Sequence, residues 1–218
     1  MKRRIITLLT LLLCSLSRLA AQTMDIEIPE REILETINGS PGIITTVVSQ
    51  EMGDDHIRWI EMYTDVHIAS AIPMDKLRRT ILDFDQYPQI FRRNQKTDVI
   101  REGGAVCLDM AVGAEFLGID FLVNYRVAVA KLRDTPEEFI LDFSYVSDDG
   151  GVKDVSGRWH IKKLPRPEGA EQQYYIRYHA YSKVARKYPL QRMIMSLFIN
   201  SESRDLMNQF IKAAGRED

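Results

Sequence analysis

Apolar and polar residues alternate along most of the chain from residue 43 onwards. The alternation is clearest between Ile60 and Ile68, where every second side chain is apolar or a threonine and those between are charged, aromatic or histidine. A period of two is typical of a strand with one buried face and one wet face. This pattern, or a β-branched apolar run, predicts strands at Ile43–Gln50, Ile57–Ile72, Lys96–Arg101, Ala105–Ala114, Ile119–Leu132, Glu138–Ser147, Val155–Lys163 and Gln172–Val184.

Helical periodicity replaces this alternation in three places. Pro73 suits the first turn of a helix, and the apolar residues that follow it at helical spacing are Leu77, Ile81 and Phe84. Tyr87-Pro88 breaks this helix and leaves Gln89–Arg93 for a second short turn. A long helix is predicted over Pro189–Ala214, about 39 Å in length, and a short one over Glu30–Ile37.

The strands are joined by short connections rich in Gly, Pro and Asp, including Gly103-Gly104 and Asp148-Asp149-Gly150-Gly151. Connections of this length indicate an antiparallel meander. One face of the meander collects large apolar residues, and the other carries most charges, among them Arg126 and Asp142, which could pair across neighbouring strands. The apolar face is larger than the helices can cover. It therefore indicates a cavity, with a plainly packed core as the alternative.

The first 21 residues, MKRRIITLLTLLLCSLSRLAA, have the layout of a secretory signal. Three cations precede the apolar run Ile5–Leu13, which is too short to span a bilayer, and we expect cleavage after Ala21. The protein would then be periplasmic or extracellular. Lipoprotein anchoring through Cys14 is disfavoured because the bulky Leu13 precedes it. An uncleaved N-terminal anchor stays open.

Composition narrows the range of partners. The chain has 218 residues, of which 45% are hydrophobic and 28% charged, as in globular proteins. Removing the four cations of residues 1–21 leaves 25 basic residues against 31 acidic ones, a net charge of −6. This charge argues against a nucleic-acid partner and against purely electrostatic attraction to anionic lipid. Only Cys107 remains after cleavage, which excludes an intramolecular disulfide.

Motifs for catalysis, cofactors and metals are missing from the sequence. The four histidines and Cys107 lack the spacing of metal ligands or of a nucleophile with its base, and there is no GxGxxG, P-loop or GxSxG motif. We therefore predict no metal, no cofactor and no catalytic residue. Three acids stand out by position, and each is interpreted as solvent-exposed: Asp83, Asp85 and Glu115.

The order of these elements resembles the START-like superfamily, also called SRPBCC, which includes polyketide-cyclase-like and coenzyme-Q-binding-like proteins. The resemblance is carried by the segment Ile68–Leu77, in which a strand runs into a Pro-started helix, and by the acidic-aromatic-Pro break of Leu82–Pro88. Gly157-Arg158-Trp159 in a late strand and Pro189 before the last helix also fit. The resemblance covers roughly residues 43–214, after an N-terminal extension over 22–42.

The resemblance implies an α+β helix-grip fold, in which a curved antiparallel sheet wraps around the long C-terminal helix and two short helices follow the first long strand. It also implies a hydrophobic ligand, such as a lipid, sterol or quinone-like molecule, held between sheet and helix. The ligand-binding residues we expect are Leu108, Met110, Tyr125, Leu141, Phe143, Tyr145, Trp159 and Tyr178 from the sheet and Met193, Leu197 and Phe198 from the helix.

Three functions follow from this interpretation. The first is an exported binding or transfer protein for a hydrophobic small molecule, monomeric and with a transient membrane contact left open. The second is a cyclase-type enzyme, whose general acid or base would be Tyr125, Tyr145 or Tyr178. The third is an envelope interaction module with a packed core.

Ligand pockets typically measure about 300–1,000 Å³. Left empty, even the smallest of them would cost roughly 7 kcal/mol, so we expect a pocket here to be filled, partly collapsed or wet.

Overall fold

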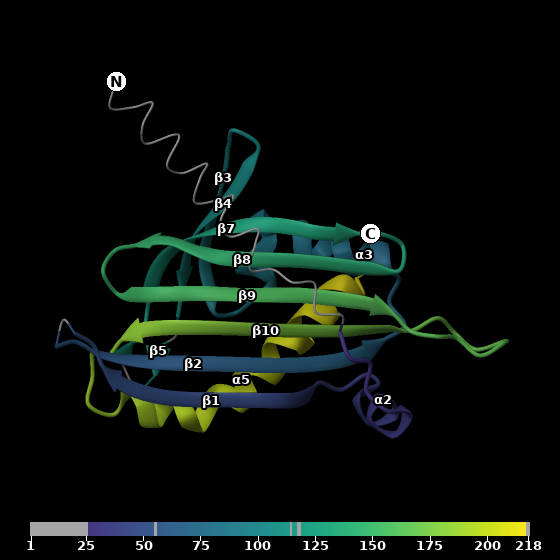
Figure 1. The fold of residues 1–218 in the computed structure, drawn as a ribbon, viewed down its shortest axis with the longest axis horizontal. Coiled ribbons are helices and arrows are strands. Elements are labelled where there is room, and N and C mark those ends of the chain that lie inside the picture. Colours follow the sequence, from purple (N-terminus) through teal and green to yellow (C-terminus); the bar gives the residue numbers. More distant parts are fainter. Residues whose placement is uncertain (1–25, 55, 114, 117–118, 217–218) are drawn as a thin grey trace.

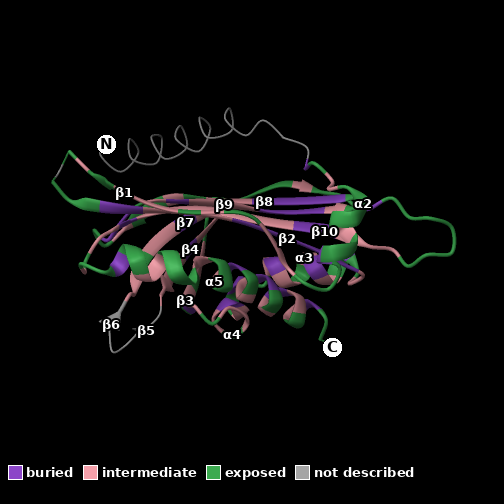
Figure 2. Cartoon of the chain, turned by 90° about the horizontal axis from the view of Figure 1, so that it is seen from below, coloured by how far each residue is buried: buried purple, intermediate pink, exposed green. Residues whose placement is uncertain are grey.

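The computed structural model describes residues 26–54, 56–113, 115–116 and 119–216. The predicted signal peptide, with Cys14, lies outside this range, as does the side chain of Glu115. An antiparallel sheet of eight strands is crossed by one long helix, α5 (Gln191–Ala214) (Figure 1). Figure 2 shows the helices α3, α4 and α5 together on one side of this sheet.

The sheet has the order β1-β2-β10-β9-β8-β7-β4-β3, and every neighbouring pair is antiparallel. Successive strands from β3 to β10 pair as the meander predicts. The last of them, β10, also pairs with β2, in a register that places Ile176 opposite Ile68. The strands are β1 (Gly42–Met52), β2 (Arg58–Ser70), β3 (Asn94–Glu102), β4 (Ala105–Val112), β7 (Val123–Asp134), β8 (Glu138–Asp148), β9 (Val152–Lys163) and β10 (Tyr174–Ala185).

The connection between β4 and β7 differs from the prediction. The strand expected over Ile119–Leu132 is divided, and a separate small hairpin of β5 (Glu115–Phe116) and β6 (Ile119–Asp120) precedes β7. The segments before and after this hairpin lie close together, since a Cβ at Gly113 would lie 2.5 Å from the carbonyl oxygen of Phe121. Only glycine allows the two backbones to approach so closely.

The predicted helix after Pro73 is α3 (Met74–Leu82), and its apolar face is buried as expected, with Leu77 and Ile81 fully inaccessible. A 3₁₀ turn, η2 (Phe84–Gln86), and the short α4 (Tyr87–Ile90) follow. The second short helix therefore begins at Tyr87, two residues before the predicted turn over Gln89–Arg93. Proline fits this first turn because its missing N–H has no intrahelical partner there.

The C-terminal half of α5 packs against the apolar face of the sheet. Met207 and Phe210 are fully buried, and the ring of Phe210 lies 4.7 Å from that of Trp159 in β9. Burying two such side chains stabilises the fold by about 1.5–3 kcal/mol each. The fold is the predicted helix-grip arrangement.

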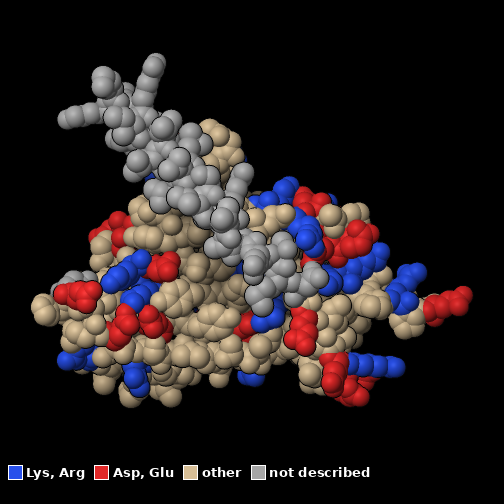
Figure 3. All heavy atoms as spheres, in the orientation of Figure 1, with Lys and Arg blue, Asp and Glu red and all other residues tan. Residues whose placement is uncertain are grey.

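The opposite face of the sheet carries bidentate ion pairs between adjacent strands. Figure 3 views this face and shows acidic and basic side chains next to one another. The predicted pair of Arg126 with Asp142 is wrong, because the strand register places a different partner opposite each residue. The pairs, with their two N–O distances, are Arg126–Asp109 (2.5 and 2.7 Å), Arg158–Asp142 (2.6 and 2.8 Å) and Arg177–Asp65 (2.9 and 2.6 Å).

The N-terminal extension also packs on this opposite face. Its short helix, α2 (Arg31–Ile37), places Ile37 in a small apolar cluster with Ile26, Tyr175 and Leu164. In the described part of the chain, no helix has the length and hydropathy needed to cross a membrane.

Candidate functional site

A cavity of about 130 Å³ lies between the apolar face of the sheet and the helices. Six strands, β3, β4 and β7 to β10, contribute to its wall, together with η2, α4, the segment after α4 and one residue of α5. Most of the lining is aliphatic or aromatic. The lining residues are Phe84, Tyr87, Phe91, Arg93, Asn94, Leu108, Met110, Val112, Tyr125, Val127, Val129, Leu141, Phe143, Trp159, Tyr178 and Leu206.

The strand pattern predicted the sheet side of this lining well. Seven of the eight predicted sheet residues line the cavity: Leu108, Met110, Tyr125, Leu141, Phe143, Trp159 and Tyr178. Tyr145 is not among the lining residues. It lies toward the end of β8, where its hydroxyl donates a hydrogen bond of 2.7 Å to Asp148.

The predicted helix side of the cavity is wrong. Met193, Leu197 and Phe198 are exposed to 52%, 69% and 38% respectively, and none of them lines the cavity. The inward face of α5 instead runs through Gln191, Met195, Ile199, Ser203, Met207, Phe210 and Ala214. Two of these residues are polar, and the exposed Met193, Leu197 and Phe198 are as apolar as the inward Met195 and Ile199. Hydrophobic periodicity therefore could not identify which face turns inward.

The polar members of this inward face are satisfied by local hydrogen bonds. The side-chain carbonyl of Gln191 accepts the backbone N–H of Lys187 at 2.7 Å, and Ser203 donates to the carbonyl of Ile199 at 2.7 Å and contacts Thr64 in β2. A buried polar side chain with partners costs little. The sequence gives no sign of these partners, because two of them are backbone groups and Thr64 is distant in sequence.

Nine lining residues were not assigned to the site, and three of them are valines on β4 and β7: Val112, Val127 and Val129. Phe84, Tyr87 and Phe91 come from the helical segment after α3, and Arg93 and Asn94 follow it. Phe84 and Tyr87 are buried and Phe91 is half-buried, and nothing in the sequence indicated that the three residues contact a cavity. Leu206 comes from the C-terminal half of α5.

An aromatic cluster shapes one end of the cavity. The rings of Trp159 and Tyr178 lie 4.5 Å apart, and Phe143 stacks on Tyr178 at 6.2 Å. On the other side Phe91 stacks on Trp159 at 6.4 Å. Aromatic contacts at these distances contribute about 0.5–1.5 kcal/mol each beyond their burial, so this wall is rigid.

Three tyrosines bring hydroxyl groups to the cavity, and burial raises the pKa of each. Tyr87 donates to the backbone carbonyl of Ile81 at 2.7 Å. Tyr125 and Tyr178 make no such hydrogen bond, and neither hydroxyl has a hydrogen-bond partner within the described residues. All three hydroxyls stay protonated near neutral pH, since burial disfavours the charged phenolate.

An ion pair links the cavity wall to α5. The guanidinium of Arg93 donates from Nε to Glu202 at 2.7 Å and makes a second contact through its terminal nitrogen. Arg92 approaches the same carboxylate at 3.3 Å. The hydrogen bond from Arg93 lowers the pKa of Glu202, and the same bond raises the pKa of Arg93. The pair joins the segment after α4 to the middle of α5.

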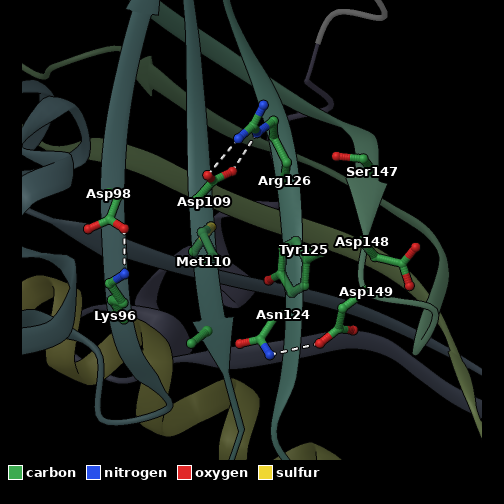
Figure 4. Close-up of a pocket in the computed structure, with 11 residues that line it drawn as sticks. Lys96, Asp98, Asp109, Met110, Asn124, Tyr125, Arg126, Ser147, Asp148 and Asp149 are labelled. Atoms are coloured by element: carbon green, nitrogen blue, oxygen red, sulfur yellow. Dashed lines mark hydrogen bonds and ion pairs between the residues drawn. The ribbon is translucent and has the colours of Figure 1, made fainter.

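A larger hollow of about 350 Å³ lies on the opposite face, over β3, β4, β7 and β8 (Figure 4). Its polar side chains bind one another: Asp109 pairs with Arg126, Lys96 with Asp98 at 2.6 Å, and Asn124 donates to Asp149 at 2.9 Å. Because these groups already have protein partners, we favour the apolar cavity as the site.

The described residues offer few side chains for metal binding or acid–base catalysis. Within the described residues there is no group of three or more His, Cys, Asp or Glu side chains placed to hold a metal ion. Asp83 and Asp85 are exposed, as the sequence indicated. The cavity lining contains neither a carboxylate nor a histidine among the described residues.

Comparison of structures confirms the fold. A STAR-related lipid transfer protein from Xanthomonas axonopodis superposes with a TM-score of 0.54 at 10% identity, covering 78% of this chain and 99% of that one. The Zhui aromatase/cyclase from Streptomyces sp. R1128 has a TM-score of 0.48 at 16% identity, covering 70% of this chain and 93% of that one. No protein-family model and no curated sequence matches. The chain therefore has the helix-grip fold that its sequence motifs indicated.

Proposed function

We propose that this protein binds a hydrophobic small molecule in the cavity between sheet and helix. The observation that carries the proposal is the cavity itself, an apolar space of about 130 Å³ in a core whose other buried side chains are closely packed. A void costs roughly 24 cal/mol per Å³, about 3 kcal/mol here, which is a large part of the stability of a domain. Occupation by an apolar ligand offsets this cost.

The volume sets the size of ligand that fits without rearrangement. An engineered cavity of about 150 Å³ in another protein holds benzene, so about 130 Å³ suits a single ring. A lipid, sterol or quinone-like molecule needs a typical pocket of about 300–1,000 Å³, and for such a ligand α5 would have to move away from the sheet. The contacts that resist this movement are the Arg93–Glu202 pair and the hydrogen bond of 2.5 Å from Thr46 to Asn200.

The polar groups of the cavity suit binding of a small molecule better than they suit a cyclase-type enzyme or a packed interaction module. A cyclase-type enzyme would need a general acid or base, and the tyrosines here have pKa values raised further from neutrality by burial. A packed interaction module would have no reason to keep a void beside unbonded hydroxyls. The function of the lipid transfer protein with the same fold points the same way.

The test is extraction of the purified protein followed by mass spectrometry, together with titration of the folded protein with a small apolar probe such as ethylbenzene. We expect a co-purifying hydrophobic compound or saturable probe binding. Absence of both would contradict the proposal and favour the interaction module.

We also propose that the protein is exported and contacts membranes through the first half of α5. Leu190, Met193 and Leu197 are each more than half exposed along this stretch, and Phe198 lies beside them. No acidic residue occurs between Gln172 and Ser201, while Arg186, Lys187 and Arg192 flank the apolar stripe. Although the chain as a whole is acidic, this combination of apolar stripe and local cations suits the surface of an anionic bilayer.

Vesicle sedimentation tests the membrane contact. Wild-type protein should sediment with vesicles of phosphatidylglycerol and phosphatidylcholine more than with phosphatidylcholine alone, and Leu197→Asp should abolish the difference. Leu132→Asp is the matched control, because Leu132 is also exposed but belongs to β7. Self-association of the wild type that Leu197→Asp removes would instead indicate an interface between two copies. The export proposal is tested separately by the mature N-terminus, which should begin after Ala21.

A further inference from the structure

The cavity contains two hydroxyl groups that the described part of the protein does not use. Tyr125 stands on β7 and Tyr178 on β10, and both line the cavity. Neither makes a hydrogen bond to a described residue. No fully buried side-chain oxygen or nitrogen among the described residues lacks a partner. Neither hydroxyl oxygen is therefore fully buried. Both side chains line the cavity, and Tyr125 also borders the hollow of the opposite face.

Apart from the indole N–H of Trp159, which makes no hydrogen bond to a described residue, the other polar side chains of the lining are already occupied. Tyr87 donates to a backbone carbonyl, and Asn94 exchanges hydrogen bonds of 2.8 and 3.1 Å with Thr97. The guanidinium of Arg93, the cation in the described lining, is held by Glu202. Only the two tyrosines are left as polar residues of the cavity that can reorient a hydroxyl toward a ligand.

Tyr125 and Tyr178 line the same cavity although their strands are not neighbours. Two strands, β8 and β9, separate β7 from β10 in the sheet, but the sheet is curved and both side chains point to its concave face. Burial is the main cause of the raised pKa of Tyr178, and Tyr125 raises this pKa further. A neutral hydroxyl both donates and accepts, so a pair can bind one carbonyl or one hydroxyl oxygen.

We propose that Tyr125 and Tyr178 form a subsite for a single neutral oxygen on a ring-sized apolar ligand, which makes the ligand class an uncharged ketone, aldehyde or alcohol. This inference rests on the proposed function and specifies its ligand. A carboxylate is excluded, because a buried negative charge without a cation is strongly unfavourable and Arg93 is already paired. A plain hydrocarbon fills the space but leaves both hydroxyls without partners, which costs affinity.

The experiment uses two nearly isosteric probes, acetophenone and ethylbenzene, with benzoate as the charged analogue. Affinities are measured by calorimetry or by NMR titration of wild-type protein, Tyr125→Phe, Tyr178→Phe and Tyr181→Phe. The last variant is the matched control, because Tyr181 lies on the same strand but on the opposite face, where it binds Glu61 at 3.0 Å. Each substitution removes only an oxygen, and thermal unfolding checks that each variant is folded.

We expect Tyr125→Phe and Tyr178→Phe to weaken acetophenone binding roughly two- to tenfold each, the equivalent of one hydrogen bond, and to leave ethylbenzene within about twofold. Tyr181→Phe should change neither, and benzoate should not bind. Equal effects on both probes, or none on acetophenone, would overturn the subsite while ethylbenzene binding kept the proposed function. Failure of the wild type to bind either neutral probe would overturn both.

Discussion

Strand β10 carries tyrosines on both faces of the sheet, and the two faces treat them in opposite ways. On the ion-paired face, Tyr175 binds His67 at 2.8 Å and Tyr181 binds Glu61 at 3.0 Å. On the cavity face, Tyr178 has no hydrogen-bond partner among the described residues. A side chain of the same type is thus a structural element on one face and an unused binding group on the other.

This difference indicates that one face of the sheet contributes mainly to stability and the other to ligand binding. The ion-paired face places its charges opposite one another in register, so each side chain is fixed by a neighbour from the next strand. The cavity face is held by apolar packing and leaves a void. Substitutions on the first face should therefore change the free energy of unfolding, and substitutions around the cavity should change binding.

The largest effect is expected from Asp65→Ala. Asp65 is buried and binds Arg177 through both oxygens, so its removal leaves a largely buried guanidinium without its partner. Loss of one member of such a pair costs about 3–5 kcal/mol, measured as the free energy of unfolding in urea. Asp109→Ala is the control, because the Asp109–Arg126 pair is about 40% exposed and should cost at most about 1 kcal/mol. Equal losses in both variants would contradict the comparison.

Two adjacent residues on β8 allow the void to be tested directly. Ile140 points to the ion-paired face and Leu141 to the cavity, and both are buried. Ile140→Trp should destabilise the protein by about 1–3 kcal/mol or more, because the added ring has no space. Leu141→Trp should cost less and abolish binding of ethylbenzene, because the ring enters the cavity. If Leu141→Trp were the more destabilising, the cavity would not be open space.

A tyrosine hydroxyl can be removed from either face of β10 by substitution with phenylalanine. Tyr175→Phe leaves the buried Nδ1 of His67 without its partner, which should cost about 1–3 kcal/mol of unfolding free energy. Tyr178→Phe removes an oxygen that has no protein partner and should change stability by less than about 0.5 kcal/mol. Thermal and urea unfolding of the two variants measure the difference. A large loss in Tyr178→Phe would indicate a hydrogen bond within the protein.

The sequence predicted the strands and the sheet side of the cavity because a period of two assigns each side chain to a face without reference to any other part of the chain. Seven sheet residues were placed correctly for this reason. The face of α5 was not predictable, because Leu197 and Ile199 are equally apolar and the choice between them depends on contacts with β1 and β2. The partner of Arg126 required the register of β4 and β7, which places Asp109 directly opposite it.

The ion-paired face should also make stability depend on pH. Burial lowers the pKa of His67, His160 and His179 in the folded protein. A depressed histidine pKa favours the neutral form, so its contribution to stability is complete above the unfolded pKa, about 6.5, and is lost as the pH falls through the folded value. The free energy of unfolding should therefore decline between pH 7 and pH 5. His160→Gln should flatten part of this decline, and an unchanged slope would argue against a role for His160.

The smallest effect is expected for ligand binding over the same range of pH. Burial raises the pKa of Tyr125 and Tyr178 above that of free tyrosine, about 10, and no carboxylate or histidine lines the cavity among the described residues. The polar groups of the site therefore keep one protonation state from pH 6 to pH 9. The dissociation constant of acetophenone should change by less than about twofold across this interval, provided that the protein stays folded. A titration of binding with a midpoint near pH 6.5 would mean that a histidine of the opposite face is coupled to the cavity, and the separation of the two faces would fail.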